Sequence, residues 1–167
     1  MKNIKDIYKG LLSLINYPHI SIDFLKDLKG PLLLHISDTP SEIYNNIFNI
    51  IDIIKPQYIV HTGDLADNIK LKIQKDRINS YCKGVKELVE GLEKNDSKVY
   101  YLMGNHDDYE VVSQFTKKGK IIEEGLLTID NLTITVGHYY KEYLFKSDFN
   151  LYGHSFEPGH YIKDGTI

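Results

Sequence analysis

The sequence predicts an α/β fold in which helices flank a parallel β-sheet. Between residues 31 and 103, short apolar runs typical of buried strands alternate with amphipathic stretches typical of helices. The 167 residues, 42% hydrophobic and 26% charged, are enough for one domain with a real core. Polar residues also follow the apolar runs, at the strand ends where open α/β sheets bind ligands.

The first residues predict a helical extension that precedes the domain. Ile4, Ile7 and Leu11 recur at helical spacing, and Pro18 ends this pattern. A second short segment, residues 22–28, ends at Gly30-Pro31. We therefore expect an N-terminal helical extension over residues 1–30 and a single domain over residues 31–167.

Three strands and two helices are expected to alternate in the first part of the domain. The predicted strands are residues 32–37, 58–62 and 99–103. The first predicted helix covers residues 41–54, with Ser41 as a candidate cap and Pro56 beyond its end. The second covers about residues 72–92. This order predicts a parallel sheet.

After residue 118 the pattern changes to a series of short strands. Asp130-Asn131 marks a hairpin turn between two of them. The predicted strands are residues 120–122, 126–129, 132–136, 150–152 and 161–162.

Composition and charge exclude several classes of protein. The single cysteine, Cys82, excludes a disulfide framework and a cysteine-rich zinc module. The apolar runs are too short to span a bilayer, and we expect a cytoplasmic protein with no membrane partner. A net charge of -3 without a basic block argues against an obligatory nucleic-acid partner. Because Arg77 is the only arginine, a metal is the candidate for neutralising a bound anion.

The polar residues after the predicted strands have the chemistry of metal ligands. Carboxylate, amide and imidazole groups suit Mn, Fe, Zn or Mg according to their mix. They are Asp38, Gly63-Asp64, Asp67-Asn68, Gly104-Asn105-His106-Asp107, Gly137-His138 and Gly153-His154. Each alone is typical of a turn, and Asp38 is also a candidate helix cap. A specified Gly-Asn-His-Asp tetrapeptide, however, arises by chance in roughly one such chain in a thousand.

With these motifs in order, residues 31–165 resemble the calcineurin-like metallophosphoesterase family. Their spacing is most similar to its compact bacterial and archaeal phosphodiesterase branch. The resemblance implies a four-layer α/β/β/α sandwich with a two-metal site.

The resemblance also implies a role for each motif residue. Asp64 would bridge the two metals, and Asn105, His138 and His154 would complete the second site. Asp38 would bind the first metal. His106, paired with Asp107, would act as the catalytic group beside the substrate phosphate, although Asp107 is also a candidate helix cap.

Two positions depart from the family pattern, and both affect the first metal. Pro40 and Phe156 stand where the family has histidines. We therefore expect one strong and one weak site for divalent ions, with Mn or Mg favoured over Fe, Zn or Ni. His160 is a candidate replacement ligand, whereas His35 and His61 lie at an odd offset from the aspartates and are expected in the core or behind the metal ligands as supporting groups.

The sequence thus predicts a metal-dependent phosphoric ester hydrolase, a phosphodiesterase or phosphatase, that uses a metal-activated hydroxide on a small-molecule phosphate ester. The alternative is a catalytically impaired fold that serves as a metal- or protein-binding module. Three tyrosines after His138, namely Tyr139, Tyr140 and Tyr143, are expected to pack in the fold or to stack on an aromatic leaving group.

Overall fold

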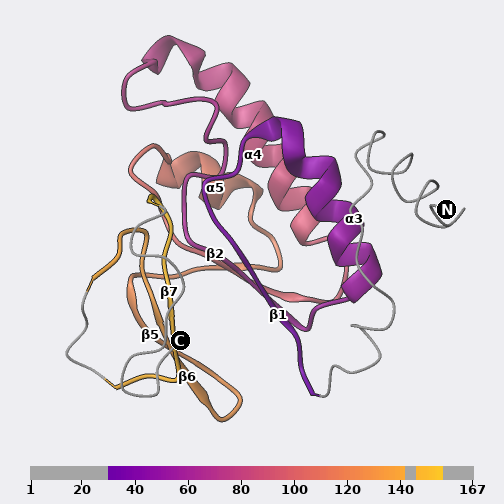
Figure 1. Cartoon of the computed structure of the whole chain (residues 1–167). Coiled ribbons are helices and arrows are strands. Elements are labelled where there is room, and N and C mark those ends of the chain that lie inside the picture. Colours follow the sequence, from indigo (N-terminus) through magenta and orange to yellow (C-terminus); the bar gives the residue numbers. More distant parts are fainter. Residues whose placement is uncertain (1–29, 142–145, 156–167) are drawn as a thin grey trace, which may run out of the picture.

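Three helices cover one face of a parallel sheet, and a second, smaller sheet packs on its other face (Figure 1). The structure, a computed structural model, describes residues 30–141 and 146–155. The predicted helices before residue 30 and the predicted strand at 161–162 lie outside these residues, as do Tyr143, Phe156 and His160.

The first sheet contains four parallel strands in the order β1-β2-β3-β4. The predicted strands of the first half are confirmed within one or two residues at each end. The short strand after residue 118 joins this sheet as its edge. The strands are β1 (Leu33–Ile36), β2 (Tyr58–His61), β3 (Lys98–Tyr101) and β4 (Lys120–Ile121).

The helices form where the amphipathic stretches predict them. The first begins as a single 3-10 turn, η1 (Ser41–Ile43), and continues as α3 (Tyr44–Ile54). It ends at Lys55, which is in the left-handed conformation and precedes Pro56. A second 3-10 turn, η2 (Lys75–Arg77), leads into α4 (Ile78–Leu92), and α5 (Tyr109–Phe115) follows β3.

The second helix begins later than the sequence predicts. Its apolar spacing starts near residue 72, but the chain there closes local turns instead. The N–H groups of Ile73 and Gln74 both donate to the carbonyl of Lys70. Residues 66–77 therefore form a loop of local turns that connects the end of β2 to α4.

The core is divided by the alternation of side chains along the strands. Ile59, Val99 and Tyr101 face the helices, where they meet buried residues of α3, α4 and α5. Tyr58 and Val60 face the second sheet. Full burial of such side chains contributes about 1.5–3 kcal/mol each, so both interfaces stabilise the sheet between them.

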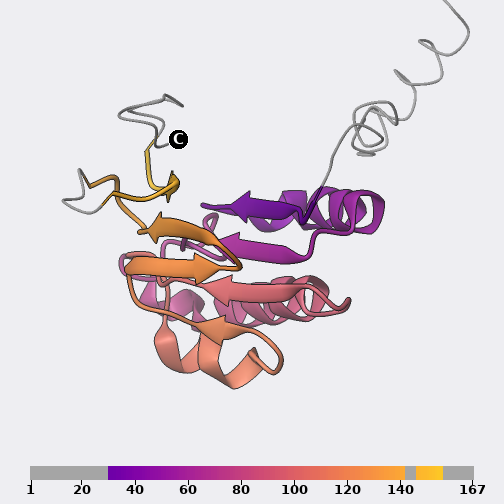
Figure 2. The ribbon, with the colours of Figure 1, turned by 90° about the horizontal axis from the view of Figure 1, so that it is seen from below.

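The second sheet comprises β5 (Gly125–Ile129), β6 (Leu132–Val136) and β7 (Phe149–Leu151). The predicted hairpin is confirmed, with Asp130 at a positive φ of 51° between antiparallel β5 and β6. β7 pairs with β6 in parallel. Ile129 and Ile134 pack toward the first sheet, and Figure 2 shows the two sheets against each other. In the part of the chain that the structure describes, the layers number three, because no helix lies on the outer face of this sheet.

The carboxyl ends of strands from both sheets meet at one edge. The N–H of Asp38, after β1, donates to the carbonyl of Gly63, after β2. The N–H of Gly153, after β7, donates to the carbonyl of His138, after β6. The polar motifs of the sequence are therefore gathered in adjoining loops.

Candidate metal centre

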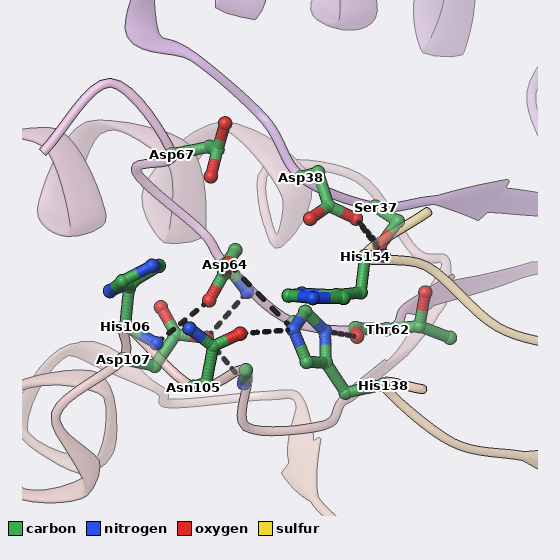
Figure 3. Close-up of polar contacts among 12 residues, drawn as sticks. Ser37, Asp38, Thr62, Asp64, Asp67, Asn105, His106, Asp107, His138 and His154 are labelled. Atoms are coloured by element: carbon green, nitrogen blue, oxygen red, sulfur yellow. Dashed lines mark hydrogen bonds and ion pairs between the residues drawn. The ribbon is translucent and has the colours of Figure 1, made fainter. Parts of the chain in front are cut away.

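Four of the predicted ligands converge on one point. Asp38, Asp64, His138 and His154 each offer a ligand atom, and these atoms all lie within 4.8 Å of one another (Figure 3). The aspartates follow strands of the first sheet, and the histidines follow strands of the second. The site therefore lies where the two sheets join.

Asp64 occupies the centre of this arrangement (Figure 3). It is 1% exposed, and its Oδ1 accepts a hydrogen bond of 2.9 Å from the N–H of His106. Its Oδ2 lies 3.7 Å from Nε2 of His138. The neighbouring Gly104 has to be a glycine, because a Cβ there would collide with Oδ1 of Asp64.

His138 presents its Nε2 atom to the same space. Its Nδ1 lies 2.8 Å from the carbonyl oxygen of Thr62, which can only accept, so Nδ1 carries the proton. In the neutral ring, Nε2 then carries a lone pair. This nitrogen lies 2.9 Å from Oδ1 of Asn105 and also faces the carboxylate of Asp64. With this tautomer, three electron-pair donors (Nε2 of His138, Oδ1 of Asn105 and the Asp64 carboxylate) face one another with no proton between them, an arrangement that suits a divalent cation. The Thr62 carbonyl orients the His138 ring in the way that a hydrogen-bond acceptor orients a metal-bound histidine.

Asp38 is held by the loops on both sides of it. Its Oδ2 accepts hydrogen bonds from the hydroxyl of Ser37 and, at 2.7 Å, from the N–H of His154. A Cβ on Gly153 would overlap Ser37, so only glycine allows this approach. The interpretation of Asp38 as a helix cap is wrong, because Pro40 is the N-cap residue of η1 and no side chain caps it.

Three of the four clustered residues have strained backbones. Asp38, Asp64 and His154 have φ values of 49°, 55° and 65°, in the left-handed region that only a few per cent of non-glycine residues adopt, aspartate and histidine more often than most. Such conformations cost of order 1 kcal/mol each and persist where the surrounding contacts enforce them. The loops are therefore shaped to aim these side chains at one another.

Asp107 does not pair with His106 as the sequence led us to expect. Its Oδ2 accepts from the N–H groups of Asp64 (2.7 Å) and Gly104 (2.8 Å). Its Oδ1 accepts from the N–H of Leu65 and from the hydroxyl of Tyr81, both at 2.9 Å. Burial raises the pKa of this carboxyl group, and the hydrogen bonds from Gly104 and Leu65 partly offset that rise. Asp107 thus ties the loop after β2 to the loop after β3.

The alternative role of Asp107 as a helix cap is also wrong. Its neighbour Asp108 is the N-cap of α5, and its side chain accepts a 3.0 Å hydrogen bond from the N–H of Val111. Both aspartates are therefore committed to backbone donors.

His106 lies across Asp64 from His138 and His154 (Figure 3). Its Nδ1 is buried and has no hydrogen-bond partner among the described residues. A buried unpaired ring nitrogen is uncommon outside functional sites. The ring is therefore held by its backbone contact to Asp64 and by packing.

Of the two histidines expected in the core or behind the ligands, His61 is fully buried, whereas His35 is only partly buried. The Nδ1 atom of His61 accepts from the N–H of Gly63 at 3.2 Å, and its Nε2 lies 2.7 Å from the hydroxyl of Thr39. Burial lowers the pKa of His61 to about 3. His35 contacts the hydroxyl of Thr62 at 3.0 Å. Neither ring contributes an atom to the ligand cluster.

Sequence reasoning missed Tyr81 and left the role of Tyr139 open. The Tyr81 hydroxyl donates to Asp107 and accepts from the N–H of Asp108, yet it belongs to the buried face of α4 and has no motif around it. The Tyr139 ring lies 4.4 Å from that of His154 and 4.8 Å from that of His138. Tyr139 therefore packs against both clustered histidines while it stays 42% exposed.

Fold and site together define an α/β protein whose strand-end loops form a metal-binding cluster. The family model for calcineurin-like phosphoesterases matches residues 31–163, and the chain belongs to this family of phosphoric ester hydrolases. No curated protein matches the chain significantly. Within the described ranges, no helix has the length and apolar character needed to cross a membrane.

Proposed function

We propose that the chain is a divalent-metal-dependent phosphoric ester hydrolase of the compact phosphodiesterase branch, with the four-layer sandwich of its family. The observation that carries the proposal is the convergence of Asp38, Asp64, His138 and His154 within 4.8 Å. The family match begins at residue 31, which supports a domain over 31–167 after an extension over 1–30. The net charge of -3 argues against nucleic acid, so we take small phosphate esters as the substrates. We place this activity in the cytoplasm.

The residues divide into a strong and a weak metal site. Asn105, His138 and His154 would hold the second cation together with Asp64, which would also serve the first site. Asp38 supports the first cation, Mn or Mg. When bound, such cations offset phosphate charge and activate water for hydrolysis.

The remaining groups bind and orient the ester. His106 is assigned the catalytic role, because it lies beside Asp64 and its buried Nδ1 has no hydrogen-bond partner among the described residues; its ring would donate a proton to the leaving oxygen. Asp107 is a positioning residue that fixes the loops of Asp64 and His106 through its four hydrogen bonds. Asp64 therefore accepts from His106 in a fixed geometry.

The second candidate is a catalytically impaired metal- or protein-binding module. It is favoured by Pro40, which occupies the N-cap position of η1. Its side chain carries no ligand atom, at a position where the family has a histidine. This candidate predicts one bound metal ion per chain, whereas the hydrolase predicts two when substrate is present.

The test is hydrolysis of bis(4-nitrophenyl) phosphate and 4-nitrophenyl phosphate by the metal-stripped chain after addition of Mn²⁺. We expect turnover that EDTA abolishes and that falls by about 100-fold or more in Asp64→Asn and His106→Ala. The matched control for the charge change is Asp52→Asn, on the exposed side of α3. Folding of each variant is checked by circular dichroism.

The same assay also defines the result that refutes the hydrolase proposal. If the Mn²⁺-loaded chain hydrolyses both esters no faster than His106→Ala, the enzymatic proposal is wrong. Elemental analysis that finds a single ion per chain then supports the binding module.

A further inference from the structure

A pocket of about 600 Å³ opens beside His106, on the side of it formed by the loop between β2 and α4. Asn105 and His106 form one wall, together with Asp107 and Asp108. Leu71, Lys72, Lys75 and Ile78 form the other. The volume is that of a small-molecule site, and it is larger than a phosphate group requires.

The pocket adjoins the metal-binding cluster through its inner wall. Asn105 contacts His138 at 2.9 Å, and the N–H of His106 donates to Asp64 at 2.9 Å. A phosphate held at the cluster therefore has its leaving group within reach of this pocket. His106 stands between the two spaces.

The outer wall carries two unpaired positive charges. Lys72 and Lys75 are exposed and form no ion pair or hydrogen bond with any residue of the described part. The neighbouring Lys70 is instead paired with Asp67, and Arg77 donates to Gln74. Of the four basic residues between positions 70 and 77, Lys72 and Lys75 are therefore the two that remain able to meet an anion from solution.

The acidic groups of the pocket are already engaged. Asp107 accepts four hydrogen bonds, and Asp108 accepts one from the N–H of Val111. Their charges remain, but both oxygens of Asp107 and Oδ1 of Asp108 already accept hydrogen bonds within the protein. Leu71 and Ile78, both half-buried against the helix-facing core, supply apolar surface between the lysines and His106.

The geometry points to a leaving-group subsite that selects phosphate esters whose leaving group has an apolar body and a second negative charge. Leu71 and Ile78 contact the apolar body, and Lys72 and Lys75 bind the distal anion. This assignment rests on the proposed function, because it takes the scissile phosphate to lie at the metal-binding cluster. It makes the two lysines the residues that determine specificity.

Binding of non-hydrolysable phosphonates tests the subsite without turnover. Calorimetry of the Mn²⁺-loaded chain compares methylphosphonate, benzylphosphonate and 4-carboxybenzylphosphonate. We expect the affinity to rise in that order, and the Lys72→Gln/Lys75→Gln variant to lose about 5-fold for the carboxylated ligand alone. That loss shrinks as NaCl rises from 0.05 to 0.5 M.

A second pair of lysines provides the control. Lys83 and Lys86 lie on the exposed side of α4, so Lys83→Gln/Lys86→Gln removes the same charge away from the pocket. Hydrolysis of phenyl phosphate and 4-carboxyphenyl phosphate adds a kinetic readout. The pocket variant should lower kcat/KM about 5-fold for the carboxylated ester and less than 2-fold for the other.

The outcomes separate the subsite from the activity. If neither ester is hydrolysed but the pocket variant alone weakens the carboxylated phosphonate, the hydrolase proposal fails and the subsite stands. If both lysine variants bind all three phosphonates as the unaltered chain does, the subsite is refuted whatever the activity. Equal weakening in both variants also refutes it, because the effect is then one of net charge.

Discussion

Replacement of Asp107 by asparagine should destabilise the fold more than it alters the chemistry. The carboxylate accepts from Asp64, Gly104, Leu65 and the Tyr81 hydroxyl, whereas an asparagine keeps only one acceptor oxygen. If the amide nitrogen takes the Oδ2 place, two backbone N–H groups lose their partner. If it takes the Oδ1 place, the Tyr81 hydroxyl oxygen can accept from the amide, so one backbone N–H, that of Leu65, is left unpaired, together with the hydroxyl proton of Tyr81.

The second orientation is the less costly one and sets the magnitude. One buried N–H without a partner costs about 1–3 kcal/mol. The bonds to Asp64 and Gly104 also lose their charge assistance, which adds about 1 kcal/mol. We therefore expect Asp107→Asn to lower the free energy of unfolding by about 2–4 kcal/mol, and Tm by roughly 5–15 °C in a chain of this length.

Urea unfolding of the metal-free chain measures this loss directly. Asp108→Asn is the matched control, because asparagine caps a helix as well as aspartate does, and its effect should stay within about 0.5 kcal/mol. The reasoning is refuted if Asp107→Asn is as stable as the control while kcat falls. That result would mean that Asp107 orients His106 after all.

Two further predictions concern pH and a close contact. The pKa of His61 is about 3 when folded, below its ordinary value of 6.5, so its contribution to stability is complete above pH 6.5 and is lost as pH falls toward 3. Between pH 7 and pH 5 the unaltered chain should therefore lose about 2 kcal/mol more unfolding free energy than His61→Gln, and equal losses in urea melts would contradict this. Gly104→Ala should weaken Mn²⁺ binding at least about 10-fold, because the new Cβ displaces Asp64, as isothermal calorimetry can measure. Gly84→Ala is its control, since a Cβ there meets its nearest neighbour, Ala66, at an ordinary 3.4 Å.

The first sheet and its helices could be predicted because local and tertiary signals agree there. β2 is buried along its whole length and begins with the apolar run Tyr58-Ile59-Val60, and the end of α3 is marked by Lys55 and Pro56. The start of α4 could not be placed, because apolar spacing does not reveal that Lys70 binds two later N–H groups. The two-residue β4 is too short for its pattern to show which sheet it joins.

The residues of the site could be predicted, but not all their contacts. Strand-end motifs indicate which side chains reach the sheet edge, and the structure brings Asp38, Asp64, His138 and His154 together there. Two of the four partners of Asp107 are main-chain groups of a loop more than forty residues earlier, which no spacing encodes. Tyr81 likewise gives no signal, because its hydroxyl reaches Asp107 from a helix that otherwise reads as core.

The division of the candidate ligands between two sheets also links metal binding to cooperativity. Asp38 and Asp64 belong to loops of the first sheet, and His138 and His154 to loops of the second, so cations that share Asp64 would add metal bonds to the apolar packing and the few hydrogen bonds that join the two layers. Free Mn²⁺ at about 100 times its dissociation constant would stabilise the native state by about 2.7 kcal/mol. The layers would then unfold as one unit, and the concentration of free metal would set how readily proteases reach the β5–β7 layer.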